Sequence, residues 1–212
     1  MQRRMSNRHV MNSHTISLKT KFLLVLAIVG INVFLPCAVS ADPLEVGDPA
    51  PDLMGVEIHS GRRVNLYRLM TDHSFQKEKN GRLTIGADGK YVSLFRRNVL
   101  VLNFFSRFCI PCIREIPAYQ RVARKFKDRP VKMLFVNTDG DISLAALQAI
   151  AEKRAITLPV LYVNQQEVMR TYQPRALPKL LVIGKDRKVV RILTGFREDF
   201  ETVLTGIVRE LL

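Results

Sequence analysis

Cys109 and Cys112 stand three positions apart in a chain of 212 residues that contains only three cysteines. Two thiols at this spacing form a disulfide that an attacking thiolate can open, and the free thiols can close it again. As a structural bridge the pair would add little to the stability of the fold, because closing so short a loop removes little entropy from the unfolded chain. The spacing therefore predicts redox chemistry, with a purely structural bridge as the alternative.

The segments around the cysteines favour the redox interpretation. Residues 99–105 form a nearly continuous β-branched and aromatic run, which predicts a strand buried on both faces of a sheet, and residues 113–127 show helical periodicity. The first turn of a helix favours an anion, so Cys109 is placed to be the attacking thiolate and Cys112 to resolve the mixed disulfide. Pro111 suits the first turn because that turn requires no N–H from it.

A metal site at the cysteines is not predicted, and neither is a bound cofactor. Downstream of the first 41 residues only His59 and His73 could add imidazole ligands to the pair, and both lie in the N-terminal half of the chain. A zinc site commonly needs four ligands from Cys, His and carboxylates.

Residues 1–41 predict export. They contain five basic and no acidic side chains, an apolar stretch over residues 22–35, and Val39-Ser40-Ala41 as a cleavage site before Asp42. We expect a signal peptide, with an uncleaved membrane anchor or a lipoprotein centred on Cys37 as alternatives. Each places the domain outside the cytoplasm, in a periplasm or equivalent space, where disulfides persist.

The charge of the chain excludes few partners. The net charge is +14, and removing the five N-terminal cations leaves 28 basic and 19 acidic residues, or +9. The basic residues are scattered and form no stripe interleaved with aromatic residues, so nucleic acid is not predicted. The basic charge could instead serve to bind anionic lipid headgroups or an acidic partner protein, or it could belong to a merely solvated surface.

Residues 42–212 are expected to form one α/β domain with a central mixed sheet flanked by helices. Residues 69–93 have the least clear secondary-structure pattern, and we predict that they form an inserted loop or a small extra hairpin. The other expected elements are an extended arm at 42–53, a hairpin at 55–66, strands at 99–105, 131–136, 160–163, 179–183 and 189–193, and helices at 113–127, 144–156, 165–172 and 200–212.

Three stretches together resemble one family. Residues 101–117, from Val-Leu-Asn-Phe-Phe through Cys-Ile-Pro-Cys to Ile-Pro, resemble the active-site segment of the TlpA/ResA-like branch of the thioredoxin superfamily. The lead-in at residues 46–52 and the Ala176-Leu177-Pro178-Lys179 stretch are similar to the start and the cis-proline loop of that branch. The resemblance covers about residues 45 to 212, apart from the expected insert.

The resemblance implies a thioredoxin fold and a set of site residues. Cys109 would be the nucleophile and Cys112 the resolving thiol, with Phe108 and Pro111 at the substrate surface. A cis peptide between Leu177 and Pro178 would face the sulfurs and leave the Leu177 backbone free to pair with an extended substrate. An ordinary trans turn proline is the alternative.

Proton handling is a second implication of the resemblance. Thioredoxins proper usually carry a buried Asp where this chain has Asn103, which cannot exchange a proton. A Glu of the TlpA/ResA-like branch matches Glu115, which would have a raised affinity for protons and assist the Cys112 thiol. A solvated Glu in the first helical turn is the alternative. Phe108 replaces the Trp that is common in the family, which puts substrate preference in doubt.

The resemblance also implies partners. It favours a monomeric dithiol reductant of client proteins, for example in cytochrome c maturation, that draws electrons from a membrane donor of the DsbD or CcdA type. A peroxiredoxin-like thiol peroxidase is one alternative, although the Phe-Ser-Arg-Phe-Cys segment lacks the prolines of such a site. A redox-inert or metal-carrying binding module is another, although no His follows His73.

Overall fold

The computed structural model describes residues 43–212. The expected signal peptide or anchor, residues 1–41, lies outside the described residues, and so does Asp42. Within the described part of the chain, no helix is long and apolar enough to cross a membrane.

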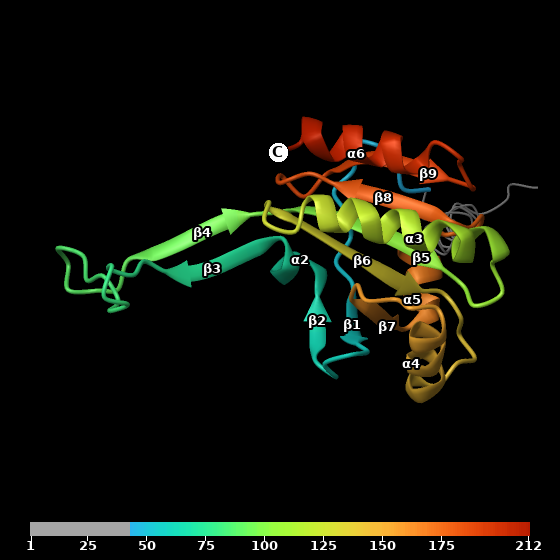
Figure 1. Cartoon of the computed structure of the whole chain (residues 1–212), viewed down its shortest axis with the longest axis horizontal. Coiled ribbons are helices and arrows are strands. Elements are labelled where there is room, and N and C mark those ends of the chain that lie inside the picture. Colours follow the sequence, from blue (N-terminus) through green and yellow to red (C-terminus); the bar gives the residue numbers. More distant parts are fainter. Residues whose placement is uncertain (1–42) are drawn as a thin grey trace, which may run out of the picture. The chain divides into compact units, whose positions relative to one another are not determined.

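Strand β5 (Val99–Phe105) is an interior strand of a seven-stranded mixed sheet (Figure 1), and all seven of its residues are buried. It pairs in parallel with β6 (Val131–Asn137) and antiparallel with β8 (Lys179–Ile183). The full strand order is β2-β1-β7-β6-β5-β8-β9. The remaining members are β1 (Met54–Glu57), β2 (Arg63–Asn65), β7 (Val160–Val163) and β9 (Val189–Thr194). The predicted α/β class with a mixed sheet is confirmed.

Helices cover both faces of this sheet. Tyr119, Leu147 and Leu204 bring α3, α4 and α6 into one apolar cluster, and Leu66 and Tyr172 join α2 and the end of α5 in a second cluster. Helices α3, α4 and α6 each bury several residues of one apolar face, as the sequence periodicity indicates. The short helix α2 was not predicted from the sequence. The described helices are α2 (Leu66–Leu69), α3 (Ile110–Lys125), α4 (Leu144–Lys153), α5 (Gln165–Thr171) and α6 (Phe200–Glu210).

The segment between α2 and β5 forms a separate two-stranded sheet (Figure 1). Strands β3 (Thr71–Phe75) and β4 (Ser93–Arg97) pair antiparallel, so the hairpin extends beyond the 69–93 range assigned from sequence. At its base the Asn98 N–H donates to the Met70 carbonyl oxygen at 2.9 Å, and Lys132 of β6 pairs with Asp72 at 3.1 Å. We call residues 71–97 the β3–β4 hairpin.

Candidate redox site

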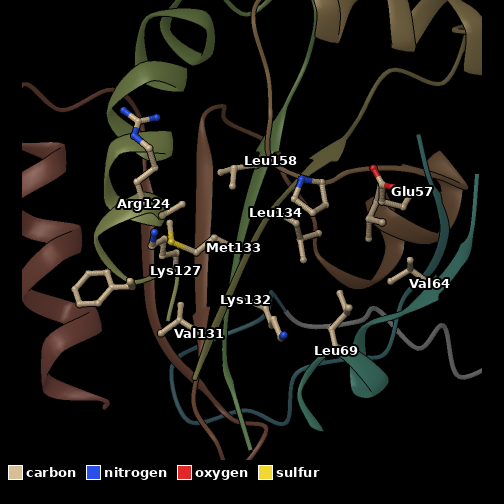
Figure 2. A pocket seen from close by; sticks show the side chains of 14 residues that line it. Glu57, Val64, Leu69, Arg124, Lys127, Val131, Lys132, Met133, Leu134 and Leu158 are labelled. Atoms are coloured by element: carbon tan, nitrogen blue, oxygen red, sulfur yellow. The ribbon is translucent and has the colours of Figure 1, made fainter. Parts of the chain in front are cut away.

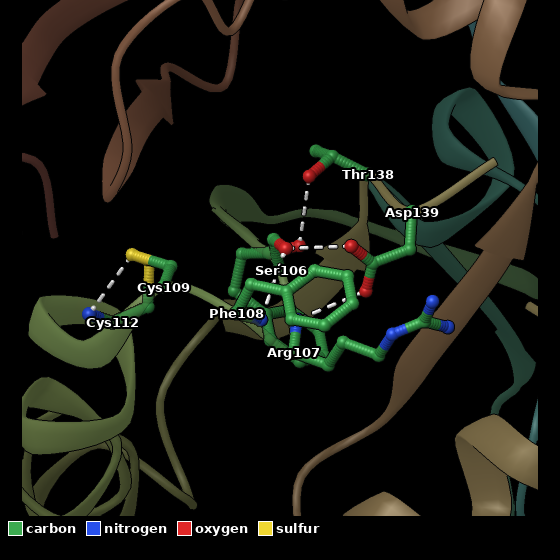
Figure 3. Close-up of a disulfide and its surroundings, with 8 residues drawn as sticks. Ser106, Arg107, Phe108, Cys109, Cys112, Thr138 and Asp139 are labelled. Atoms are coloured by element: carbon green, nitrogen blue, oxygen red, sulfur yellow. Dashed lines mark hydrogen bonds between the residues drawn. A yellow bond between two sulfur atoms is a disulfide. The ribbon is translucent and has the colours of Figure 1, made fainter. Parts of the chain in front are cut away.

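The cysteines lie where the central strand passes into helix α3. Cys109 is the N-cap of α3 and accepts a hydrogen bond at its sulfur from the Cys112 N–H at 3.1 Å. The two residues are joined in a disulfide, with their Cα atoms 5.2 Å apart (Figure 3). Helix α3 begins at Ile110, three residues before the predicted start, because the Cys109 side chain caps it and Pro111 fits its first turn.

The two sulfurs differ in accessibility. Cys112 is only 2% exposed and packs in the core, whereas Cys109 is half-buried. Beside Cys109, Phe108 is 73% exposed and Ile110 is also exposed. An incoming thiol or disulfide therefore meets Cys109 first, on a surface with apolar side chains.

Asp139, which follows strand β6, holds the loop that leads to Cys109 (Figure 3). Ser106 donates from Oγ to one Asp139 carboxylate oxygen at 2.5 Å, and the Arg107 N–H donates to the other at 2.9 Å. The Ser106 hydroxyl also accepts from the Phe108 N–H at 3.2 Å. These contacts fix the backbone just before the nucleophilic position.

Sequence reasoning missed Asp139, although a signal was present. Strands β5 and β6 run in parallel with Phe105 opposite Asn137, so the residues that follow them meet at one edge of the sheet. The polar run Asn137-Thr138-Asp139 directly after a buried strand indicates side chains that serve this edge.

Replacing Asp139 with alanine tests how much these contacts stabilise the protein. Asp139→Ala leaves the Arg107 N–H and the Ser106 hydroxyl without their acceptor, so we expect the free energy of unfolding to fall by about 2 kcal/mol. Urea denaturation of the oxidised protein measures it. The control is Asp141→Ala. Among residues 43–212 the exposed Asp141 carboxylate pairs only with the Arg107 guanidinium, at 2.9 Å, so its loss should cost less than about 1 kcal/mol. Equal losses in both variants would contradict this role of Asp139.

The Arg107 side chain is engaged by its neighbours. Its guanidinium bonds to Asp141 and lies 4.4 Å from the centre of the Phe108 ring. A cation over an aromatic face is attracted to it, so Arg107 holds the exposed Phe108 ring in place.

Glu115 lies one turn after Cys112 on α3 and is 3% exposed, so the alternative of a solvated side chain is wrong. Burial raises the pKa of its carboxyl from 4.5 to about 7. Its Oε2 atom has no hydrogen-bond partner among the described residues. A carboxyl with this pKa can gain or lose a proton near neutral pH, next to the buried cysteine.

The Leu177–Pro178 peptide bond is cis, as the resemblance implies. It immediately precedes β8, whose Lys179 is paired with Phe104 of β5. The cis peptide therefore lies at the edge of the sheet from which the chain continues to Cys109. The structure thus brings the Leu177–Pro178 loop and the cysteine-bearing turn to one end of the central strand.

A disulfide at the start of the helix that follows a buried central strand, with a cis-proline loop at the same edge, defines the thioredoxin class of thiol-disulfide oxidoreductases. The family model of the AhpC/TSA family matches residues 76–192, more than half of the chain. The chain belongs to the AhpC/TSA family.

Relatives and solved structures agree with this class. ResA from Geobacillus kaustophilus, a thiol-disulfide oxidoreductase, is 27% identical over 193 residues, which is 90% of this chain and 94% of the relative. A Chlorobium tepidum protein assigned as the thiol:disulfide interchange protein DsbE superposes with a TM-score of 0.61 at 19% identity, over 79% and 98% of the two chains. The thioredoxin domain of a Bacteroides vulgatus thiol-disulfide oxidoreductase gives 0.58 at 16% identity, over 78% and 99%. The chain is thus a TlpA/ResA-like thiol-disulfide oxidoreductase with a thioredoxin fold.

Proposed function

We propose that the protein is an exported reductase that passes two electrons from the Cys109–Cys112 dithiol to disulfides of client proteins. The observation that carries the proposal is the pairing of an accessible Cys109 with a buried Cys112 that has Glu115 one turn away. The arrangement separates an attacking sulfur from a resolving sulfur and provides a group that can take up a proton.

The reaction balances in two steps. The Cys109 thiolate attacks a client disulfide, forms a mixed disulfide and releases one client thiolate. The Cys112 thiol then gives its proton to the Glu115 carboxylate and attacks the Cys109 sulfur, which releases the second client thiolate and leaves the pair oxidised. Because its pKa is raised to about 7, Glu115 is a stronger base than an ordinary carboxylate and suits this proton transfer.

The surface beside Cys109 supports binding of an extended client segment. Phe108 and Pro111 are exposed there, and a cavity of about 190 Å³ next to Phe108 is lined by Ile113, Ile116 and Ile150 among others. An apolar client side chain would enter this cavity while the client backbone pairs with Leu177 beside Pro178.

The proposed setting is the periplasm, with the protein acting as a monomer. Each reduced client leaves an oxidised pair, so a donor must return two electrons, and we propose a membrane protein of the DsbD or CcdA type. Disulfides of apocytochrome c, which must be reduced to thiols during cytochrome c maturation, are the proposed substrates, since the relatives named ResA and DsbE belong to the branch that the active-site stretch resembles.

The reduction potential of the Cys109–Cys112 couple tests the direction of electron flow. We expect a value near that of thioredoxin, about −270 mV, or lower, from equilibration with glutathione or dithiothreitol buffers followed by counting of free thiols. A potential approaching about −120 mV would make the protein a disulfide donor instead. If the cysteine pair cannot be reduced and reoxidised at all, the oxidoreductase proposal is wrong and the disulfide is a structural bridge.

A further inference from the structure

One face of the β3–β4 hairpin carries a cluster of exposed aromatic side chains. His73 lies directly opposite Phe95 in the strand register, and their ring centres are 4.7 Å apart. Phe75 contacts His73 at 4.9 Å and Tyr91 at 6.0 Å between ring centres. Phe95 is 70% exposed, and Phe75 and Tyr91 are exposed as well. We call these four residues the aromatic face.

The same hairpin is basic. Residues 71–97 contain six Lys and Arg residues against three acidic ones, and of the six only Arg96 forms an ion pair with a described residue, Asp72. The other five extend exposed side chains from the strands and from the connection between them: Lys77, Lys79, Arg82, Lys90 and Arg97. Exposed aromatic rings and unpaired cations therefore occur together on one small element.

A cavity next to the base of the hairpin also combines apolar and basic side chains (Figure 2). It measures about 360 Å³, and most of its lining is apolar, including Leu69, Val131 and Met133. Three basic residues, Arg124, Lys127 and Lys132, and one acidic residue, Glu57, also line it. Lys132 is the residue that pairs with Asp72 of β3. Arg124 and Lys127 form no ion pair with any residue in 43–212.

Both features lie at the end of the central strands that is farthest from the cysteines. The hairpin enters β5 at Val99, and Val131, the first residue of β6, lines the cavity. Cys109 follows the opposite end of β5, beyond Phe105. Nothing in the redox chemistry requires exposed aromatic rings or unpaired cations at the end where these strands begin.

We propose that the β3–β4 hairpin and the adjoining cavity dock on the surface of an anionic lipid bilayer. Tyr and Phe rings on an amphipathic surface bind at the boundary between lipid headgroups and acyl chains, and Lys and Arg side chains around them gain energy from the phosphates of anionic lipids. A second copy of the chain fits this face less well, because two hairpins of like charge repel each other. Docking in this way presents Cys109 on the side away from the bilayer.

Two reporters test the proposal in the full chain, which contains no tryptophan. Phe95→Trp places a single fluorophore on the aromatic face, and Phe108→Trp places one beside Cys109 at nearly the same exposure, 73% against 70%. With vesicles containing phosphatidylglycerol, we expect the emission of the Phe95→Trp protein to move to shorter wavelength and that of the Phe108→Trp protein to stay unchanged. The shift should vanish in about 1 M salt, where the Debye length is about 3 Å.

Comparing the two reporter positions distinguishes membrane binding by the hairpin from any membrane binding by residues 1–41, because the latter would be common to both reporter proteins. On the Phe95→Trp background, Lys90→Gln should weaken the apparent affinity for the anionic vesicles about fivefold. Lys153→Gln removes an exposed cation beside Phe108 and should leave the affinity unchanged.

Several outcomes would overturn the proposal. They are an unshifted Phe95→Trp emission, an equal shift with vesicles of phosphatidylcholine alone, or equal shifts for both reporters. A Phe95→Trp emission that shifts with protein concentration in the absence of lipid would assign the face to a second copy of the chain. A shift with polyglutamate but not with vesicles would assign it to an acidic protein partner.

Discussion

Replacing Cys112 with serine is expected to convert the protein into a trap for its clients. The Cys109 thiolate still attacks a client disulfide, but no second sulfur releases the adduct, so a mixed disulfide accumulates and turnover falls to the uncatalysed background. Non-reducing electrophoresis followed by mass spectrometry of the adduct measures this, with insulin as a model client.

The matched control is Cys109→Ser. Both variants also carry Cys37→Ser, so Cys112 is the only thiol left in this one. Because Cys112 is 2% exposed, we expect neither adduct nor turnover. Similar adduct yields from the two variants would show that the sulfurs are equivalent toward clients, which is incompatible with separate attacking and resolving roles.

Replacing Glu115 with glutamine is expected to stabilise the oxidised protein at alkaline pH. The folded protein raises the pKa of this carboxyl from 4.5 to about 7, so the folded state binds the proton more tightly than the unfolded state. Below about pH 4.5 the group is protonated in both states and costs nothing. Stability then falls as the pH rises from about 4.5 to 7, and above pH 7 the full penalty of about 3 kcal/mol remains.

Glu115→Gln removes this penalty, so its gain over the unsubstituted protein should be near zero at pH 4.5 and up to about 3 kcal/mol at pH 8. Urea denaturation of the oxidised proteins at the two pH values measures the difference. Glu152→Gln on α4, an exposed position, serves as the control and should show no such dependence. A gain that is the same at both pH values would mean that the charge of Glu115 is not what burial penalises.

The same substitution is expected to slow the resolution step. Glutamine cannot accept a proton, so the mixed disulfide of Glu115→Gln should persist longer at neutral pH, and raising the pH should restore its rate as Cys112 ionises on its own. Quenched-flow trapping of the mixed disulfide at several pH values follows this. An unchanged lifetime would remove Glu115 from the proton pathway.

The parts of the fold that could be predicted are those whose signal is local. Strands β7 and β8 have the predicted boundaries, because their short apolar runs are bounded by Pro159, Asn164 and Pro178. Strand β5 was equally clear from its run of β-branched and aromatic side chains, and the structure buries all seven of its residues. In each case the run of side chains is sufficient to identify a buried strand.

The parts that could not be predicted depend on distant partners. Strand β3 consists largely of polar residues and forms because β4, about twenty residues later, completes its ladder. Asp139 meets Ser106 only because β5 and β6 run in parallel. Burial of Glu115 is likewise a result of packing, since its position one turn into an amphipathic helix was compatible with either exposure or burial.

The β3–β4 hairpin shares no strand ladder with the seven-stranded sheet. The backbone hydrogen bond from Asn98 to Met70 joins the two chain segments at its base, where it leaves the main domain. Its sequence is therefore released from the packing constraints that act on the core. Under the proposed docking, substitutions that accumulate in the hairpin during evolution would change which lipid surface the protein binds, while the thiol chemistry stays constant. Divergence among homologues in this segment should then record differences between host membranes.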